Sequence, residues 1–394
     1  MDGGSWPESC HLVNTDKAVR YHRLKRRAGV GARVLSAVML VALLLTGGSI
    51  WLRNLAAAVT VSSPDTQSAP AAIALYVLLL CALWQVLTLP VAYYSGVVLE
   101  GRYGLTVQTT QGWLRDQLKG VIVFVALSIA AAEFLYFTIR RWPDQWWLIA
   151  SVGFGCAVLL LARLAPVVLL PLFYRFKPLD RPQLQERLRT LAARAGLPAL
   201  GVYEWGLGEK TRRANAALVG VGGTRRILLS DTLITDYSDD EIEVVLAHEL
   251  AHHAHHDVLT AVAAQTTLLL LGLAAAAWTT DLAAYVRPWV QAAGAADVAG
   301  LPLILLATGA VSVMAAPLVN ALSRSHERRA DAYALRLTAR PTAFISAMRR
   351  LGAQNLAEPQ PSRTVQWLFH SHPPIEERIE HAQQFDRGGG SGIR

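Results

Sequence analysis

Residues 71 to 99 form an uncharged, mostly apolar stretch that reads AAIALYVLLLCALWQVLTLPVAYYSGVVL. About 20 helical residues cross the hydrocarbon core of a bilayer, so this stretch is long enough to span a membrane. Five more apolar runs are of similar length: Val34–Ala57, Leu118–Ile139, Trp146–Phe173, Val258–Thr280 and Gly300–Leu322. Together they predict a mainly α-helical, polytopic membrane protein with about six transmembrane helices.

The composition agrees with this fold class. Of the 394 residues, 53% are hydrophobic and 17% are charged, against about 25% charged in an ordinary soluble domain. Intrinsic disorder and a small disulfide-stapled secreted module are therefore excluded. Cys10, Cys81 and Cys156 lie too far apart to form a metal cluster by themselves, and we expect them to pack as small side chains.

The distribution of basic residues predicts the orientation. Seven precede the first apolar run: Lys17, Arg20, Arg23, Lys25, Arg26, Arg27 and Arg33. The loop at 58–70, AVTVSSPDTQSAP, has no Lys or Arg. The positive-inside rule then predicts a cytoplasmic amino terminus, and six spans return the carboxyl terminus to the same side of a plasma (inner) membrane. Beside a membrane span, this basic stretch indicates topology rather than nucleic-acid binding, and we expect no nucleic-acid partner.

Two ionisable residues fall inside apolar runs, Glu133 in the third and Arg163 in the fourth. A lone charge in lipid costs several kcal/mol, so both side chains are expected to face the bundle interior or a wet cavity. They could pair with each other, as a structural ion pair or as part of a functional site.

The composition changes sharply after the fourth run. FKPLDRPQLQERLRTLAARAGLP, from Phe176, is typical of an amphipathic helix, and GVYEWGL and ANAALVGVGGTRRILLSD are typical of short strands. Ser238 followed by Glu241 is a capping box that starts another helix. We expect a basic cytoplasmic segment at 1–33, four spans within 34–173 and a cytoplasmic α+β catalytic segment at 174–257. Two spans follow within 258–322, then a helical tail at 323–394.

The strongest chemical motif is His248-Glu249-Leu250-Ala251-His252, an H-E-x-x-H. On a helix, residues four apart share a face, so His248 and His252 can offer ring nitrogens to one zinc ion. Glu249 then lies beside the metal-bound water as its general base. The alternative is a polar, histidine-rich helix surface near the membrane. His253, His255 and His256 are not needed for this geometry and form either a solvated face or an accessory metal site.

A catalytic zinc takes three protein ligands and keeps one position open. Glu327 and Asp331, one turn apart in SRSHERRADAYAL, supply a candidate third ligand and a carboxylate that can orient a ligating histidine. His326 is a competing ligand that points off their common face. His370, His372 and Arg378 in FHSHPPIEER form the last informative group, with His372 in a rigid turn before two prolines.

Together these motifs resemble the integral-membrane CAAX prenyl protease type 1 family, zinc metalloendopeptidases of the gluzincin kind. TLPVAYYSGVVLEGRYGLTVQTTQGWLRDQLKG (88–120) resembles the family's segment between two spans, and APVVLLPLFYRFKPL (165–179) resembles the start of its catalytic domain. ANAALVGVGGTRRILLSDTLI (214–234), SRSHERRADAYA (323–334) and SHPPIEER (371–378) follow in the family's order. The resemblance extends from about Ala71 to Ala382.

The resemblance implies a ring of membrane helices around a water-filled chamber, with the zinc site at its cytoplasmic end. One catalytic Zn²⁺ would bind His248, His252 and Glu327, and Glu249 would activate the water. The resemblance also implies that a substrate pairs with an edge strand at Asn215 and Ala216. His372 would stabilise the oxyanion, and Arg378 would line the site. Asp331 would hydrogen-bond to a metal ligand without binding the metal itself. The implied partners are the bilayer and a peptide or membrane-protein substrate, with or without a lipid.

The chain also departs from the family. Eukaryotic members have seven spans where six are counted here, and Asp257 stands where they have a further histidine. The Ala-, Leu- and Arg-rich composition suggests a bacterial chain, in which prenylated CAAX proteins are not expected. Two other functions therefore stay open: quality-control proteolysis without a lipid requirement, and non-catalytic transport or lipid binding with structural zinc. The last needs a fourth protein ligand, which His256 or Asp257 would have to supply.

Overall fold

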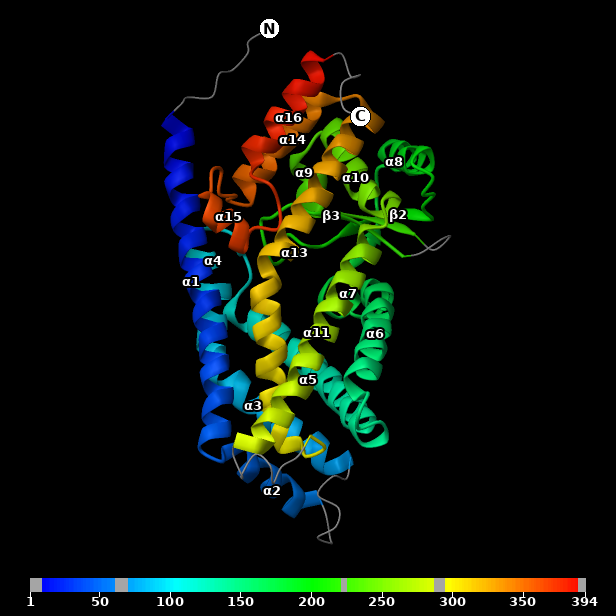
Figure 1. Cartoon of the computed structure of the whole chain (residues 1–394). Coiled ribbons are helices and arrows are strands. Elements are labelled where there is room, and N and C mark those ends of the chain that lie inside the picture. Colours follow the sequence, from blue (N-terminus) through cyan, green and yellow to red (C-terminus); the bar gives the residue numbers. More distant parts are fainter. Residues whose placement is uncertain (1–8, 61–69, 221–224, 287–294, 389–394) are drawn as a thin grey trace.

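A computed structural model describes residues 9–60, 70–220, 225–286 and 295–388. Within these residues six helices are long and apolar enough to cross a membrane: Asp16–Leu45, Pro70–Arg102, Thr110–Arg141, Trp146–Leu164, Asp257–Asp281 and Val298–Thr338. The expected number of spans is thereby confirmed. The long helices form one end of an elongated molecule, and the small sheet with its surrounding helices forms the other (Figure 1).

The helices of the amino-terminal part are α1 (Ser9–Leu45), α2 (Gly48–Thr60), α3 (Pro70–Tyr93), α4 (Leu99–Arg102), α5 (Thr110–Arg141), α6 (Trp146–Val168) and α7 (Leu170–Phe173). A π-helical turn at Tyr94–Val98 joins α3 to α4. The later helices are α8 (Pro182–Arg194), α9 (Asp231–Asp236), α10 (Asp239–Ala254), α11 (Asp257–Val286), α13 (Leu301–Thr338), α14 (Pro341–Gln354), α15 (Arg363–Phe369) and α16 (Ile375–Arg387), with a 3₁₀ turn at Val298–Gly300 before α13.

The first span differs from the predicted Val34–Ala57. Helix α1 ends at Leu45, and Gly47 takes a left-handed φ of 73° before α2 begins. Glycine adopts this conformation without the penalty that a Cβ atom brings, so the chain turns there. The helix Asp16–Leu45 therefore includes all seven of the basic residues that precede the predicted span. The predicted outward loop at 58–70 lies mostly outside the described residues.

The basic half of α1 reaches past the bundle to the end of the molecule that holds the sheet (Figure 1). Arg26 Nη1 pairs with Glu358 at 2.5 Å, and His22 Nε2 lies 2.8 Å from the backbone oxygen of Leu356. Both partners belong to the segment between α14 and α15. Helix α1 thus connects the membrane bundle to the carboxyl-terminal helices.

The pairing of Glu133 with Arg163, which the sequence left open, is not present in the described part of the chain. A short loop joins the end of α5 to the start of α6. Glu133 is closer to this loop along α5 than Arg163 is along α6, and at 1.5 Å per residue the two distances from the loop differ by about 13 Å. The Arg163 side chain is exposed, and the buried Oε1 of Glu133 accepts no hydrogen bond from a described residue.

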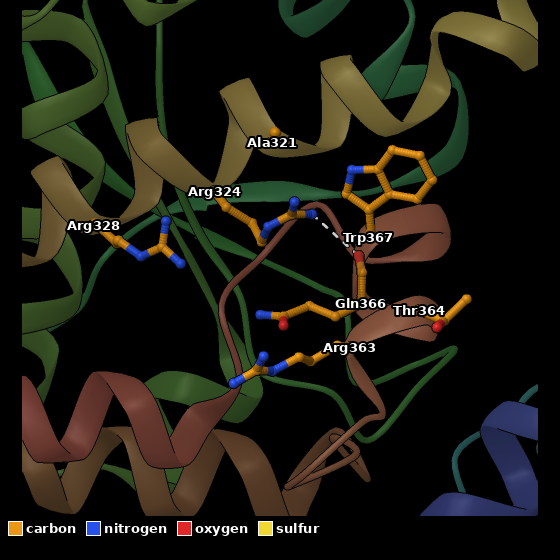
Figure 2. A pocket seen from close by; sticks show the side chains of 7 residues that line it. All are labelled: Ala321, Arg324, Arg328, Arg363, Thr364, Gln366 and Trp367. Carbon is orange, nitrogen blue, oxygen red and sulfur yellow. Dashed lines mark hydrogen bonds between the residues drawn. The ribbon is translucent and has the colours of Figure 1, made fainter.

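Helix α13 is continuous from the last apolar span into the polar segment that carries Glu327 and Asp331. Helix α11 packs along its apolar part. The short helix α15 lies against its middle, where Arg324 Nη1 donates to the backbone oxygens of Gln366 at 3.1 Å and His370 at 2.6 Å (Figure 2). One helix therefore joins the membrane part to the site.

The sheet has four strands: β1 (Phe176–Pro178), β2 (Gly201–Trp205), β3 (Ala216–Val219) and β4 (Arg226–Ser230). Their order is β1-β2-β4-β3, with β2 parallel to β4 and the other pairs antiparallel, so β3 lies at an edge. The predicted strands β2, β3 and β4 are confirmed. The predicted helix starts at Pro182 rather than Phe176, because residues 176–178 pair with β2, a contact that local sequence does not indicate.

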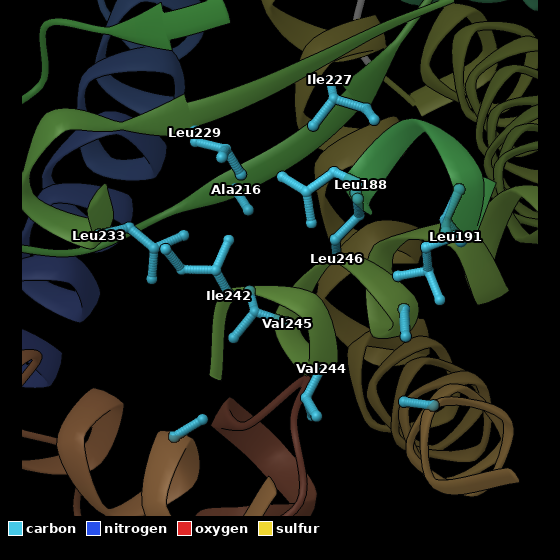
Figure 3. Packing of buried hydrophobic residues seen from close by; sticks show 14 of the residues in the cluster. Leu188, Leu191, Ala216, Ile227, Leu229, Leu233, Ile242, Val244, Val245 and Leu246 are labelled. Atoms are coloured by element: carbon cyan, nitrogen blue, oxygen red, sulfur yellow. The ribbon is translucent and has the colours of Figure 1, made fainter. Parts of the chain in front are cut away.

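Helix α10 is buried beneath this sheet (Figure 3). Its side chains Ile242 and Leu246 join Leu188 of α8 and Ile227 and Leu229 of β4 in one core, and all five are at most 1% exposed. The predicted capping box is confirmed: Ser238 and Glu241 satisfy each other's backbone N–H groups at its start. The helix that carries His248 and His252 is thus held rigidly from both its start and its apolar face.

Candidate active site

The centre of the site joins two helices that are distant in sequence. His248 and His252 on α10 bring their Nε2 atoms to 3.2 Å from each other. Glu327 on α13 completes a triangle, with Oε2 3.4 Å from His248 Nε2 and Oε1 3.5 Å from His252 Nε2. The structure thus brings together the three predicted metal ligands.

Two carboxylates hold the outer nitrogens of these histidines. His248 Nδ1 lies 2.9 Å from Asp331 Oδ1, and His252 Nδ1 lies 2.8 Å from Asp257 Oδ2. A carboxylate only accepts hydrogen bonds, so each Nδ1 donates and each Nε2 is free to direct a lone pair to the centre. Two lone pairs and a carboxylate meeting at this spacing require a cation between them.

The triangle fits a tetrahedral zinc ion. With zinc bonds of 2.0–2.1 Å, neighbouring ligand atoms lie about 3.3–3.4 Å apart. Here the two histidine nitrogens are 3.2 Å apart, and each has one of the two Glu327 oxygens at 3.4 or 3.5 Å. The described residues contain no fourth protein ligand in this group. Asp257 is committed to the outer side of His252, so it does not close the site as a structural zinc centre would require.

The electrostatics of His248 also favour a cation. Burial by itself lowers the pKa of this imidazole, but its hydrogen bonds to Asp331 and Glu327 outweigh the burial and raise the pKa to about 9. Without a metal, a proton on His248 therefore supplies the positive charge that the surrounding carboxylates attract. A bound dication would take the place of that proton.

Glu249 faces a cavity of about 510 Å³ beside the ligand triangle. The cavity is also lined by His248, Glu327, His372 and Arg378. Burial raises the pKa of the Glu249 carboxyl above its ordinary value. A base whose pKa is closer to neutrality can take a proton and then release it, as general acid–base catalysis requires.

His372 and Arg378 reach the site in different ways. The exposed His372 has Nδ1 2.9 Å from Glu327 Oε2, at the mouth of the cavity. Arg378 instead forms a bidentate ion pair with Asp331, in which Nε donates to Oδ2 at 2.8 Å and Nη2 donates to Oδ1 at 2.6 Å. Arg378 thus acts on the centre through the carboxylate that holds His248.

Asn215 and Ala216 border the same cavity, where β3 begins. The backbone N–H of Ser230 donates to Asn215 oxygen at 2.9 Å, so Asn215 faces β4. Backbone groups alternate in direction along a strand, so those of Ala216 face away from the sheet. The edge next to the metal ligands therefore presents an N–H and a C=O that the sheet does not use.

The remaining histidines lie around the site without joining it. His253 Nε2 is 2.8 Å from the backbone oxygen of Leu218, the ring of His255 lies against that of Tyr333, and His256 has a φ of 56° between α10 and α11. His326 Nδ1 is 3.8 Å from Asp257 rather than in the triangle. Among the described residues no second group has metal-ligand geometry, so nothing supports an accessory site.

Asp257 and Arg329 are the two site residues that the sequence reasoning missed. In the sequence Asp257 stands out only as a departure from the family or a candidate fourth ligand, whereas in the structure its carboxylate accepts a hydrogen bond from the outer nitrogen of His252. Arg329 Nη2 in turn donates to Asp257 Oδ1. Asp257 begins α11, and only the turn between α10 and α11 brings it back to His252. Its proximity to the motif was the one available signal.

Comparison with known proteins adds the family. Residues 178–386, more than half of the chain, match the model of peptidase family M48. The chain belongs to peptidase family M48. Residues 9–175 match a second model, described as the CAAX prenyl protease N-terminal domain with five membrane helices. The two matches adjoin at residues 175–178, so the membrane bundle and the site-bearing part both fall within the described family architecture.

Individual proteins similar to this chain support the same family assignment. The chain is 31% identical over 314 residues to the uncharacterized metalloprotease YhfN of Bacillus subtilis, which covers 78% of this chain and 72% of the relative. It is 28% identical over 321 residues to CAAX prenyl protease 1 of Saccharomyces cerevisiae, covering 76% and 70%. The crystal structure of S. mikatae Ste24p has the same fold, with a TM-score of 0.82, 22% identity, and coverage of 94% and 89%.

The family and the six candidate spans together define the class of protein. This M48 chain is a membrane metalloendopeptidase, and its fold is that of the Ste24p structure. The expected fold class and reaction class are confirmed.

Proposed function

We propose that this M48 chain is a zinc-dependent endopeptidase whose single catalytic ion is held by His248, His252 and Glu327. The observation that carries the proposal is the ligand triangle, with both histidines held from behind by carboxylates and one side open to the cavity that contains Glu249. Three ligands with an open side favour catalysis over a purely structural role for zinc.

The residues around the triangle have distinct tasks in this proposal. Zinc, when bound, lowers the pKa of water and polarises the scissile carbonyl. Glu249 accepts the proton from the attacking water and passes it to the leaving nitrogen. His372 donates a hydrogen bond to the oxyanion that develops on the scissile carbonyl. Asp331 and Arg378 keep His248 in the tautomer and orientation that binding requires.

The substrate is proposed to add as a strand along the start of β3. The outward N–H and C=O of Ala216 are available for this pairing beside Asn215. His253 lies at hydrogen-bonding distance from the next outward carbonyl, that of Leu218, at 2.8 Å. The substrate strand is therefore expected to end near Ala216 on that side, which places one short stretch of peptide over the metal ligands.

We further propose that the site and both chain ends lie on the cytoplasmic side of the plasma (inner) membrane. Support comes from the basic residues of α1 and from Figure 1, where α1 begins and α16 ends near the same end as the sheet. The substrate class is a peptide or membrane protein with a CAAX-like carboxyl end. The relatives named CAAX prenyl protease 1 support the added requirement for a lipid on that substrate.

The test uses purified protein and two peptides of one CAAX-ending sequence, with and without a farnesyl group on the cysteine. Mass spectrometry locates the cut, and Glu249→Gln serves as the blank because it keeps the ligands and removes the base. We expect wild-type protein to cut the farnesylated peptide three residues from its end, and the variant to retain zinc without cutting either peptide.

The other outcomes are equally informative. Equal cutting of both peptides would overturn the lipid requirement and leave a general membrane endopeptidase of the quality-control kind. Normal turnover by Glu249→Gln would overturn the proposed mechanism itself. Zinc binding without cleavage of either peptide by wild-type protein would overturn the proposed CAAX-like substrate class.

A further inference from the structure

A second hollow of about 600 Å³ lies between α13 and α15, away from the catalytic cavity. Its lining residues are Ala321, Arg324, Arg328, Arg363, Thr364, Gln366 and Trp367. Figure 2 shows Arg324 and Arg328 projecting from α13, and Arg363 reaching back from the start of α15 into the same space. None of these residues has a task in the proposed peptidase mechanism.

Arg324 is the central feature, because it is only 7% exposed yet has no acidic partner in the described part of the chain. Its Nη1 donates to two backbone oxygens, those of Gln366 and His370, which fix the guanidinium without neutralising it. Burying a charge is costly unless an opposite charge accompanies it. The hollow therefore presents a positive charge that the neighbouring groups do not offset.

The other two arginines add to the excess of positive charge in the hollow. Arg328 Nε donates to Glu377 Oε1 at 2.6 Å, so one carboxylate offsets one guanidinium. Arg363 is exposed, and among the described residues no carboxylate pairs with it. Three guanidinium groups thus share one carboxylate. Their forked donors match the oxygens of a phosphate better than those of a small spherical anion.

The rim of the hollow identifies the kind of phosphate. Trp367 is itself one of the lining residues, so the hollow has an aromatic wall beside its arginines. On α15, Trp367 is 52% exposed, and Leu368 and Phe369 are exposed beside it. The Asn320 amide of α13 donates to the Leu368 backbone oxygen at 2.8 Å, which holds this apolar end of α15 against the face of α13 that carries the arginines.

A group of exposed apolar side chains that includes a tryptophan and lies beside arginines is typical of the membrane–water interface. We propose that this hollow binds the phosphate group of an anionic phospholipid. The headgroup contacts Arg324, Arg328 and Arg363, and the acyl chains lie along the exposed apolar side chains of α15 that begin with Trp367 in the hollow. A free phosphate ion offers the same charge but gains nothing from the apolar rim.

Such a lipid would also stabilise the segment that enters the catalytic site. Arg324 binds the backbone of His370, two residues before His372. Filling the hollow therefore restrains the turn from which His372 reaches Glu327. Lipid binding itself does not depend on peptide cleavage, so it can be measured on the inactive Glu249→Gln protein as well.

The test uses the purified full chain in a neutral detergent, titrated separately with phosphatidylglycerol, phosphatidylcholine and inorganic phosphate. Bound lipid is counted by native mass spectrometry, and the melting temperature is followed by tryptophan fluorescence. We expect saturable binding and stabilisation by phosphatidylglycerol only. Arg363→Gln should weaken that binding about fivefold, the contribution of one basic residue near an anionic lipid.

Arg363→Gln removes no described contact, so its fold is expected to persist, and Arg328→Gln, which loses only the Glu377 pair, is a second variant. Arg189→Gln, on the exposed face of α8, is the matched control and should bind as wild type does. Unchanged binding in both site variants, or equal binding of phosphatidylcholine, would overturn the proposal. Equal affinity for inorganic phosphate would overturn its assignment to a lipid.

Discussion

Each ligating histidine is backed by an aspartate, and each aspartate is backed by an arginine. Arg378 holds Asp331 behind His248, and Arg329 holds Asp257 behind His252. The first set is buried, with the Arg378 side chain 11% exposed, whereas the Arg329 side chain is 44% exposed. The two sets of histidine, aspartate and arginine therefore differ in their environment: the set with His248 is shielded from solvent, and the set with His252 is partly exposed to it.

We predict that Asp331→Asn and Asp257→Asn each weaken zinc binding about 10- to 100-fold, because the ligating histidine then bonds to a neutral amide instead of a charged carboxylate and becomes a weaker base. Asp331→Asn should have the larger effect, since it also leaves the buried Arg378 guanidinium unpaired. Competition with a chromophoric zinc chelator measures the affinity, and peptide cleavage is measured in parallel.

Asp281→Asn is the control for these two substitutions, because Asp281 is exposed near the far end of α11 and has no described partner. It should bind zinc with wild-type affinity. Wild-type affinity in Asp331→Asn as well would show that His248 does not need this carboxylate for binding.

At the level of elements, the decisive arrangement is the edge strand β3 above the metal-binding helix α10. The core in Figure 3 fixes α10 against the inner face of the sheet, so β3 and the two histidines keep a constant relation. Because β3 pairs only with β4, its outer edge is available to a peptide at the point where the metal ligands lie. Cleavage would then depend on backbone pairing as well as on side-chain recognition.

We predict that Ala216→Pro lowers kcat/KM about 3- to 10-fold, the value of one net hydrogen bond, while zinc binding is unchanged. Proline removes the outward N–H of Ala216, which the sheet does not use, and proline is tolerated at such edge positions. Steady-state cleavage of a peptide substrate, together with zinc content, measures both effects.

Ala217→Pro provides the contrast, because the N–H of Ala217 faces β4 and belongs to the sheet. This substitution should destabilise the protein and lower its melting temperature rather than selectively reduce cleavage. If Ala216→Pro cleaved the peptide with unchanged kcat/KM, strand addition at this edge would be refuted.

For the whole molecule, the metal site connects two parts of the structure. Two ligands come from α10, packed on the sheet, and the third comes from α13, which continues into the membrane bundle. In Figure 1 these helices converge just above the long apolar helices. A bound ion would therefore join the α+β part to the bundle and stabilise their mutual arrangement.

We predict that removing the metal with a chelator abolishes cleavage and lowers the melting temperature, and that stoichiometric zinc restores both. Free zinc at 100 times its Kd stabilises the folded state by about 2.7 kcal/mol. Glu249→Gln should show the same zinc-dependent stabilisation without cleavage, which separates binding from chemistry. Thermal unfolding with and without chelator measures this, and an unchanged melting temperature would contradict the proposed ligand set.

The sequence alone was sufficient for the features that depend on local pattern. Long uncharged runs indicated six spans, the Ser238–Glu241 pair indicated the start of α10, and H-E-x-x-H placed His248 and His252 on one face. Each of these depends on residues within about one or two helical turns, or on the length of an apolar run, so no long-range contact was needed. The ordered motifs then identified the family.

Only the tertiary structure decided the features that depend on long-range contacts. It placed Glu327 against two histidines about 80 residues earlier, assigned Asp257 to His252, and separated Glu133 from Arg163. It also paired residues 176–178 with β2 and gathered three arginines of two helices in one hollow. Such contacts depend on how helices and strands pack against one another, and local propensity or periodicity carries no information about that packing.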